Sequence, residues 1–269
     1  FVVAISNYNR DLILSECGAE YADKTVVIHC GVDTDVFRHR ARGDVQDRIN
    51  GPFNIVCVGT LHEVKGQSYL IEACRLLRDR GIDFVCHFVG DGPDRVTLAN
   101  QVERAGLHDR VRFHGQCTRE EIAEQLRQAS VLVAPSVPTS DGRREGIPVV
   151  LMEAMASGVP VVASRLSGIP ELVQHEVGGL LAPPRDAAAL ADAIMQVHQH
   201  PETAALRAES ARQRVEQEFD LFRNAAALAE LFQRTDSSCR VAPRDTEYIE
   251  HPIAHQEAPE PAVSGCIPT

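Results

Sequence analysis

The sequence lacks the features that would indicate a membrane-spanning, nucleic-acid-binding or disulfide-stabilised protein. It contains no tryptophan, and no apolar run approaches the roughly 20 residues that a helix needs to span a bilayer. Acidic residues outnumber basic ones by 38 to 27, so the net charge is −11 and the basic excess needed to bind nucleic acid is missing. The eight cysteines include no C-x-x-C pair, so we expect no metal site, and reduced cysteines in a cytoplasmic protein.

The chain also lacks an initiator methionine, because it begins with Phe1 inside an apolar run that ends at Ile5. Such a run is typical of a buried strand and rare at a natural start, so we expect residues 1–269 to be part of a longer protein. Residues 1–37 are too few to form a core of their own. Residues 235–269 contain five prolines and an excess of acidic residues, a composition that predicts a disordered tail.

Between these two ends, short apolar runs alternate with segments that have helical spacing. The predicted strands lie at 53–59, 84–89, 111–114, 131–134, 159–163 and 179–182. The predicted helices lie at 68–80, 96–105, 118–129, 148–157 and 219–234, and two more begin at Asp186 and Pro201. Strands this apolar, alternating with helices, indicate a parallel sheet covered on both faces, the doubly wound, Rossmann-like α/β class. Such sheets bind ligands at the carboxyl ends of their strands, so the loops there form the candidate site.

Two of those loops carry residues that suit a phosphate. In the first, Lys65 precedes Gly66 and a predicted helix, where a cation and free backbone N–H groups can meet an anion. A solvated loop lysine is the alternative, and the loop does not match the Walker pattern. The second loop contains Gly90 and Gly92 but lacks the third glycine of a dinucleotide fingerprint, and Pro93 interrupts it. It is either a tight turn that opens a helix or a turn that lets a nucleotide approach the backbone.

The strongest motif is a pair of carboxylates, Glu145 and Glu153, which are separated by seven residues. Glu145 precedes the predicted helix, and Glu153 lies inside it, about two turns further on. The free N–H groups at the start of this helix point into the same cleft. Because Glu153 falls in an otherwise apolar stretch, its carboxylate needs a partner, either an arginine or the hydroxyl groups of a sugar.

The segment from Glu145 to Glu153 resembles the E-x7-E motif of family-4, or group 1, glycosyltransferases of the GT-B fold. The segments at 24–37, 58–66, 90–95, 111–115 and 164–173 follow in the order of that family. The last of them contains the run from Gly168 to Glu171, Gly-Ile-Pro-Glu. The resemblance covers roughly residues 1–232, and the form of the motif is most similar to bacterial exopolysaccharide enzymes of the colanic-acid type.

The resemblance implies a retaining enzyme that moves a sugar from a UDP- or GDP-sugar to a saccharide or lipid-linked acceptor in cell-surface polysaccharide biosynthesis, without a cofactor or a required metal. Residues 38–218 would be the Rossmann-like donor-binding domain, and residues 1–37 a remnant of the amino-terminal acceptor domain with the interdomain linker. The helix at 219–234 would cross back toward that largely missing domain. We therefore expect this chain alone to bind nucleotide weakly and to transfer no sugar. The full-length protein would contact the inner face of the membrane peripherally.

The resemblance also implies a role for each matching residue. Lys65 would pair with the donor diphosphate and Glu145 would lie near the donor sugar, so these two are the predicted catalytic residues. Glu153 would hold the ribose hydroxyl groups. The other predicted donor-binding residues are Gly59, Thr60, Gly90 and Gly92, then Gln116 and Cys117 near the base, and finally Gly146, Ile147, Pro148 and Val149, whose backbone would contact sugar and phosphate.

One residue departs from the family pattern and keeps other functions open. The family commonly has an arginine where Thr60 stands, and Arg143 or Arg144 could supply that charge instead. Thr60 would suit a non-catalytic nucleotide-sugar-binding module, which the presence of both Lys65 and Glu145 opposes. Another GT-B enzyme, such as a phosphorylase or a sugar-phosphate synthase, is a further alternative. The defective glycine loop nearly excludes an NAD oxidoreductase.

Overall fold

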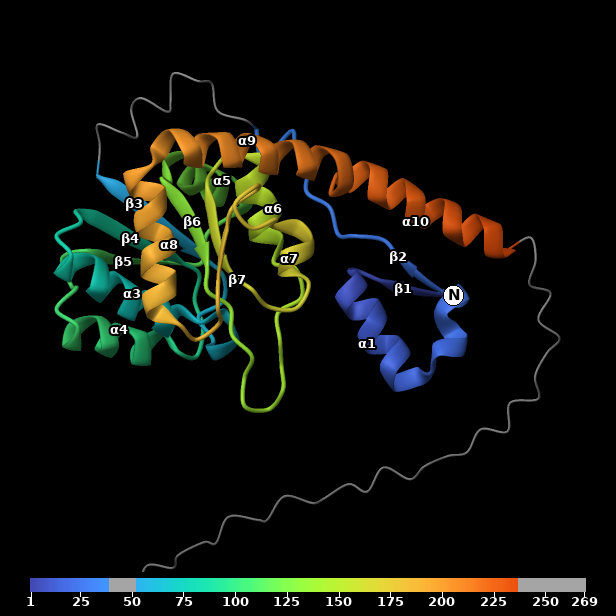
Figure 1. The fold of residues 1–269 in the computed structure, drawn as a ribbon, viewed down its shortest axis with the longest axis horizontal. Coiled ribbons are helices and arrows are strands. Elements are labelled where there is room, and N and C mark those ends of the chain that lie inside the picture. Colours follow the sequence, from blue (N-terminus) through green and yellow to red (C-terminus); the bar gives the residue numbers. More distant parts are fainter. Residues whose placement is uncertain (39–51, 237–269) are drawn as a thin grey trace, which may run out of the picture. The chain divides into compact units, whose positions relative to one another are not determined.

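The computed structural model describes residues 1–38 and 52–236, and its main sheet has six parallel strands (Figure 1). The strands are β3 (Phe53–Val58), β4 (Phe84–Val89), β5 (Val111–Gly115), β6 (Val131–Ala134), β7 (Val161–Ser164) and β8 (Leu180–Ala182). Their order in the sheet is β5-β4-β3-β6-β7-β8, so the chain builds outward first on one side and then on the other. The reversal between β3 and β6 is the switch point at which doubly wound sheets bind ligands.

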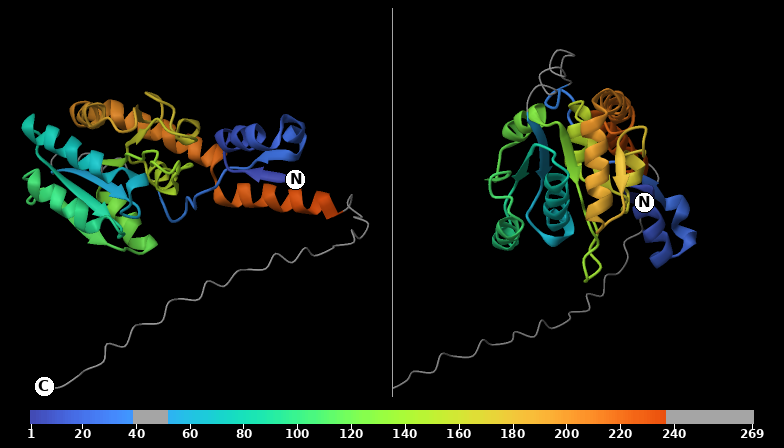
Figure 2. Two further views of the ribbon diagram at one scale, coloured as in Figure 1. Left: turned by 90° about the horizontal axis from the view of Figure 1, so that it is seen from below. Right: turned by 60° about the vertical axis from the view of Figure 1, so that its left-hand side comes forward.

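Helices cover both faces of this sheet, as the alternation in the sequence predicts (Figure 2). One face carries α3 (Gln67–Asp79), α4 (Arg95–Arg104) and α8 (Ala187–Gln199). The other carries α5 (Arg119–Gln128), α6 (Val149–Ala156) and α9 (Pro201–Glu218). In β3, Ile55 and Cys57 pack toward the first set of helices and Val56 toward the second, which explains the continuous apolar run. The predicted doubly wound α/β class is confirmed.

Local capping sets several helix ends. Thr118 forms the predicted capping box, in which its hydroxyl accepts from the backbone N of Glu121 at 3.2 Å and the Glu121 carboxylate accepts from the N of Thr118 at 2.7 Å. Asp186 caps α8 by accepting from a backbone N at 2.9 Å. Pro148 is the N-cap residue of α6, so this helix begins at Val149, one residue later than predicted.

The predicted helix at 219–234 corresponds to α10, which spans Leu221–Asp236. The prediction was wrong for Phe219, which ends α9 and is fully buried instead of opening α10. The Phe219 carbonyl oxygen accepts a hydrogen bond from the N of Val32 at 2.9 Å, and Leu221 N donates to Val32 O at 3.2 Å. A contact with a distant segment therefore decides where one helix ends and the next begins.

The first residues form a separate two-stranded parallel sheet, in which β1 (Val2–Ala4) pairs with β2 (Thr25–Val27). Between these strands lie α1 (Asn7–Cys17) and a 3-10 helix (Ala19–Lys24). Residues 1–231 make up one compact unit, and residues 232–269 are assigned to a second. The domain limits predicted after residues 37 and 218 stay predictions. The predicted tail lies outside the described residues from 237 onward, as do Cys239 and Cys266.

Three further observations apply to the described residues only. None of the helices there is long and apolar enough to cross a membrane. No group of three or more histidine, cysteine or acidic side chains is placed to hold a metal ion. The cysteines of this part, all of them unpaired, are Cys17, Cys30, Cys57, Cys74, Cys86 and Cys117.

Candidate functional site

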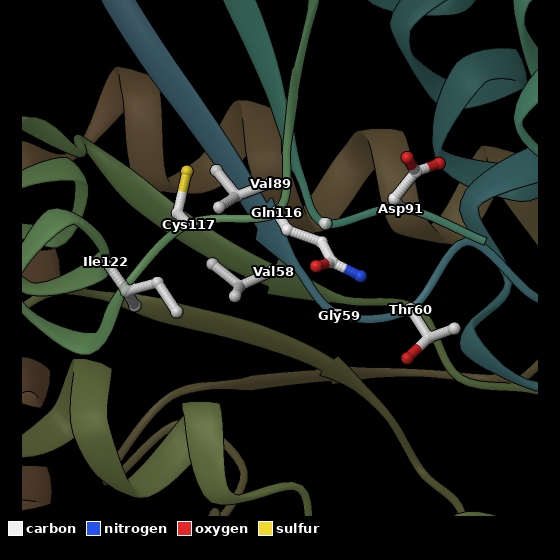
Figure 3. Close-up of a pocket in the computed structure, with 9 residues that line it drawn as sticks. Val58, Gly59, Thr60, Val89, Asp91, Gln116, Cys117 and Ile122 are labelled. Atoms are coloured by element: carbon white, nitrogen blue, oxygen red, sulfur yellow. The ribbon is translucent and has the colours of Figure 1, made fainter.

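The loops after β3, β4 and β5 line a pocket of about 260 Å³ at the carboxyl edge of the sheet (Figure 3). Its lining residues are Val58, Gly59, Thr60, Val89, Gly90, Asp91, Gln116, Cys117 and Ile122. The Gln116 side chain extends from the loop after β5 toward the loop that carries Thr60 (Figure 3). Because small-molecule pockets are typically about 300–1,000 Å³, this one suits a single ring system better than a whole nucleotide sugar.

Close backbone packing brings these loops together. Gly90 N donates to Gly115 O at 2.7 Å. Gly90 has a φ of +135°, and a Cβ there would collide with the carbonyl oxygen of Gly59. A Cβ at Gly92 would likewise collide with Leu61, so Gly92 packs within the turn whereas Gly90 lines the pocket. The turn is therefore tight, and it also presents backbone at Gly90 to the pocket.

The two predicted catalytic residues form an ion pair. Lys65 Nζ lies 2.6 Å from Glu145 Oε2, and the two side chains are 26% and 18% exposed. Lys65 ends a short 3-10 helix (Glu63–Lys65), and its side-chain stem lies beside Gly59, so the ion pair adjoins the pocket. Gly66 follows with a φ of +68°, and a Cβ there would collide with the carbonyl oxygen of Pro135. The loops after β3 and β6 are therefore in direct contact, which brings Lys65 to Glu145.

Glu153 lies in α6 with its carboxyl group largely buried. Burial raises the pKa of Glu153, and the positive charge of Arg119 opposes that rise without forming a hydrogen bond to it. Arg119 opens α5, where its guanidinium group lies over the Phe37 ring and 3.9 Å from Asp33 Oδ2. The sequence suggests either an arginine or sugar hydroxyl groups as the partner of Glu153. In the structure Arg119 acts on this carboxylate only through its charge.

The remaining predicted residues fall into two groups. Those that line the pocket are Gly59, Thr60, Gly90, Gln116 and Cys117. Those in the segment that leads from Glu145 into α6 are Gly146, Ile147, Pro148 and Val149. In the second group Ile147 is buried and Val149 is exposed, so the latter presents its surface to ligands or solvent. The candidate site thus combines a pocket with an ion pair and a helix start.

The two arginines considered in place of an arginine at Thr60 contact other groups. Arg143 Nε lies 3.0 Å from Asp141 Oδ2, and Arg144 Nη1 lies 3.1 Å from the Tyr8 hydroxyl group. Each guanidinium group is therefore directed to a partner outside the Lys65–Glu145 pair.

Sequence reasoning missed three residues of the pocket, namely Val58, Val89 and Ile122. The positions of Val58 and Val89 at the ends of predicted strands were a usable signal, because ligands of this fold bind there. Ile122 comes from α5, and no local pattern indicates that this helix turns one apolar residue toward the pocket.

The fold and the site together define a doubly wound α/β protein with a pocket and an ion pair at the carboxyl edge of its sheet. Residues 52–200 match the family described as group 1 glycosyl transferases. The chain therefore belongs to the group 1 glycosyltransferase family, which confirms the resemblance found in the sequence.

Relatives named for polysaccharide biosynthesis are among the similar proteins. The amylovoran biosynthesis glycosyltransferase AmsK of Erwinia amylovora is 38% identical over 84% of this chain and 54% of the relative. A relative named for colanic acid biosynthesis, from Escherichia coli, is 41% identical over 63% of this chain and 42% of its own length. The chain thus spans about half the length of these relatives.

A solved structure extends the similarity to the fold. The crystal structure of Anabaena Alr3699/HepE in complex with UDP superimposes with a TM-score of 0.75 at 26% identity. The similarity covers 87% of this chain and 64% of that protein.

Proposed function

We propose that this chain is the donor-binding part of a retaining glycosyltransferase that uses a UDP- or GDP-sugar. The Lys65–Glu145 ion pair carries the proposal, because it sets a cation suited to a diphosphate beside a carboxylate suited to a sugar. The adjoining pocket would take the base of the nucleotide. The acceptor, a saccharide or lipid-linked molecule of cell-surface polysaccharide biosynthesis, would bind to a part of the protein outside residues 1–269.

In this scheme Lys65 acts on the leaving group. As the bond between the anomeric carbon and the phosphate oxygen breaks, negative charge develops on the diphosphate, and the Lys65 ammonium group stabilises it. In the ligand-free protein Glu145 neutralises that ammonium group at 2.6 Å. The entering diphosphate takes Lys65 from Glu145, and the released carboxylate accepts hydrogen bonds from the donor sugar. The scheme uses no cofactor and no metal ion.

The remaining site residues hold the rest of the donor. Gln116 and Cys117 lie near the base in the pocket. Glu153 accepts hydrogen bonds from the ribose hydroxyl groups, a role that its buried position supports because a buried carboxylate is stabilised by such donors. The backbone N–H groups of Gly146, Ile147 and Val149, at the start of α6, donate to the sugar and phosphate.

The comparisons support the coarse part of this proposal. The structural neighbour binds UDP, and two relatives carry the names of polysaccharide pathways. A nucleotide-sugar donor and a polysaccharide product agree with both. The choice between UDP and GDP, the retention of anomeric configuration, and peripheral membrane contact by the rest of the protein belong to the proposal.

Isothermal titration of residues 1–269 with UDP, GDP and NAD tests the donor class. We expect weak binding of UDP or GDP, none of NAD, and no sugar transfer by this chain alone. Failure of both UDP and GDP to bind would remove the basis of the proposal. A longer protein that includes the acceptor-binding part should then transfer the sugar, and NMR of the product would report its anomeric configuration.

Glu153→Ala tests the ribose contact separately. Loss of hydrogen bonds to a charged group costs about 1.5–3 kcal/mol, so the variant should bind UDP or GDP about tenfold more weakly or worse. Unchanged affinity by calorimetry would show that the ribose does not contact this carboxylate.

A non-catalytic nucleotide-sugar-binding module is the second candidate, and Thr60 is the observation that favours it. No arginine stands at this position, and Arg144 is engaged by Tyr8. Such a module would bind nucleotide in the titration and yet show no transfer in the longer protein with any UDP- or GDP-sugar.

A further inference from the structure

Glu171 is the last residue of the Gly-Ile-Pro-Glu segment, for which neither the pocket nor the ion pair supplies a role. It lies in the short helix α7 (Ile169–Leu172), and its side chain is 21% exposed. Its Oε2 accepts a hydrogen bond from the backbone N of Asn7 at 2.8 Å and another from Asn7 Nδ2 at 3.1 Å. Its Oε1 accepts from the backbone N of Tyr8 at 2.7 Å. One carboxylate therefore holds the first two N–H groups of α1.

These contacts provide hydrogen-bond acceptors for the free N–H groups at the amino-terminal end of α1. The first N–H groups of a helix have no partner within the helix. Ser6 caps α1 through its own hydroxyl, which accepts from the backbone N of Asn9 at 3.0 Å. Glu171 supplies the acceptors for Asn7 and Tyr8 from a different element, and its negative charge also suits the helix amino terminus. The amino-terminal end of α1 is thus held by a residue of α7.

The same residues of α1 contact the loop that carries Glu145. Arg144 Nη1 lies 3.1 Å from the Tyr8 hydroxyl group. Gly168 lies between the two segments, because a Cβ there would lie 2.9 Å from Ile147 Cγ1 and 3.1 Å from the Ser6 side chain. The start of α1 therefore contacts Arg144 directly and lies across Gly168 from Ile147, on either side of Glu145 in the sequence.

We infer that Glu171 is a positioning residue, which holds the first turn of α1 against the loop at 144–147 and so fixes the place of Glu145. This inference rests on the proposed function, in which Glu145 contacts the donor sugar. Glu171 itself touches neither donor nor acceptor in this arrangement.

The charge of Glu171 gives the arrangement a defined pH dependence. Burial by itself would raise the pKa of Glu171, but the hydrogen bonds from Tyr8 and Asn7 outweigh it and leave the pKa below its ordinary value. His29, whose Nε2 lies 3.7 Å from Oε2, and Arg214, which donates to the Glu171 carbonyl oxygen at 2.8 Å, also face this residue. The ionised form therefore stabilises the contact above the ordinary glutamate pKa, and that stability is lost as the pH falls through the lowered pKa.

Amide hydrogen exchange of residues 1–269 tests the inference without any substrate. In Glu171→Ala we expect exchange at 7–14 and at 143–149 to rise about tenfold or more, because three charge-assisted hydrogen bonds are lost. Exchange in β3 and β4 should not change. Glu171→Gln should give a smaller rise, since one of its oxygens still accepts. The exposed Glu103 on α4 provides the matched control, and Glu103→Ala should change neither segment.

Amide exchange at 143–149 in Glu171→Ala decides whether Glu171 positions the loop that carries Glu145. A rise confined to 7–14 would show that Glu171 stabilises α1 alone, and no rise in either segment would also overturn the inference. If Glu171→Ala does not fold, the pH dependence replaces it, since acid should raise exchange of both segments in the wild type but not in Glu171→Gln.

A steric variant removes no charge and checks the same contact. Gly168 has a φ of −78°, so Gly168→Ala is unstrained in its backbone, but the added methyl group would push the Ser6 segment away from Ile147. We expect faster exchange at 143–149 in this variant as well, and unchanged exchange there would contradict the proposed packing. Because these measurements need no donor or acceptor, failure of the transferase proposal in titration leaves them interpretable, and the reverse holds too.

Discussion

Lys65→Ala provides the most direct test of the site. The ammonium group lies 2.6 Å from Glu145 and would exchange this partner for a diphosphate when a donor enters. The sequence contains only one other lysine, Lys24, which lies over the Tyr21 ring at 5.7 Å from its centroid and outside the site. Lys24→Ala is therefore a control matched in residue type and in the change of net charge.

The size of the effect follows from the contact. A hydrogen bond to a charged group contributes about 1.5–3 kcal/mol, and each 1.4 kcal/mol corresponds to about a tenfold change in affinity. Lys65→Ala should thus weaken binding of UDP or GDP about 10- to 100-fold, most strongly at low salt. Glu145→Ala should not weaken binding of UDP or GDP. Its affinity should stay the same or rise up to a few-fold, because the diphosphate no longer competes with a carboxylate for Lys65.

Calorimetry with the nucleoside and its diphosphate separates this effect from damage to the pocket. Lys65→Ala should reduce affinity for the diphosphate and leave that for uridine or guanosine as it was, whereas Lys24→Ala should change neither. An equal loss for nucleoside and diphosphate would mean that the substitution deforms the pocket. Unchanged affinity for the diphosphate would refute the role assigned to Lys65.

Three further results are expected. Burial raises the pKa of Glu153, so Glu153→Gln should increase the free energy of unfolding at pH 7. In urea titrations this gain should shrink as the pH falls through the raised pKa and be absent below the ordinary glutamate pKa, and a gain that does not change between pH 7 and that acidic range would contradict the assigned cause. Cys117 lines the pocket, so saturating UDP or GDP should slow the alkylation of Cys117, measured by mass spectrometry, and leave that of the exposed Cys17 unchanged. The same rate at Cys117 with and without nucleotide would place the nucleotide elsewhere. Gly66→Ala should destabilise the protein by about 2 kcal/mol more than Gly81→Ala. Both glycines have positive φ, but only at Gly66 would the added Cβ collide with the backbone of another segment, at Pro135. An equal loss of thermal stability in the two variants would count against the loop contact.

Much of the fold was predictable because its signals are local. The strands β4 and β6 have the predicted limits, since each is an apolar run bounded by residues that stop a strand. The capping box at Thr118 and the cap at Asp186 likewise depend on residues within one turn. The error at Phe219 arose where a distant partner, Val32, takes the backbone groups that would have continued the helical pattern.

The site was predictable only in part. The sequence and its family resemblance identified Lys65, Glu145 and the loops at the strand ends. They did not indicate Ile122, whose place in the pocket depends on how α5 packs. They also did not indicate the hydrogen bonds from the start of α1 to Glu171.

The sequence by itself determined the doubly wound class, the family and the two carboxylates of the motif, because hydrophobic periodicity and motif spacing are properties of contiguous residues. The tertiary structure decided that Lys65 and Glu145 pair before any ligand binds, through the close approach of Gly66 to Pro135. It also decided that the Glu171 carboxylate accepts hydrogen bonds from the first two backbone N–H groups of α1. Both contacts join segments that are far apart in the chain, so their geometry depends on loop packing that no local pattern encodes.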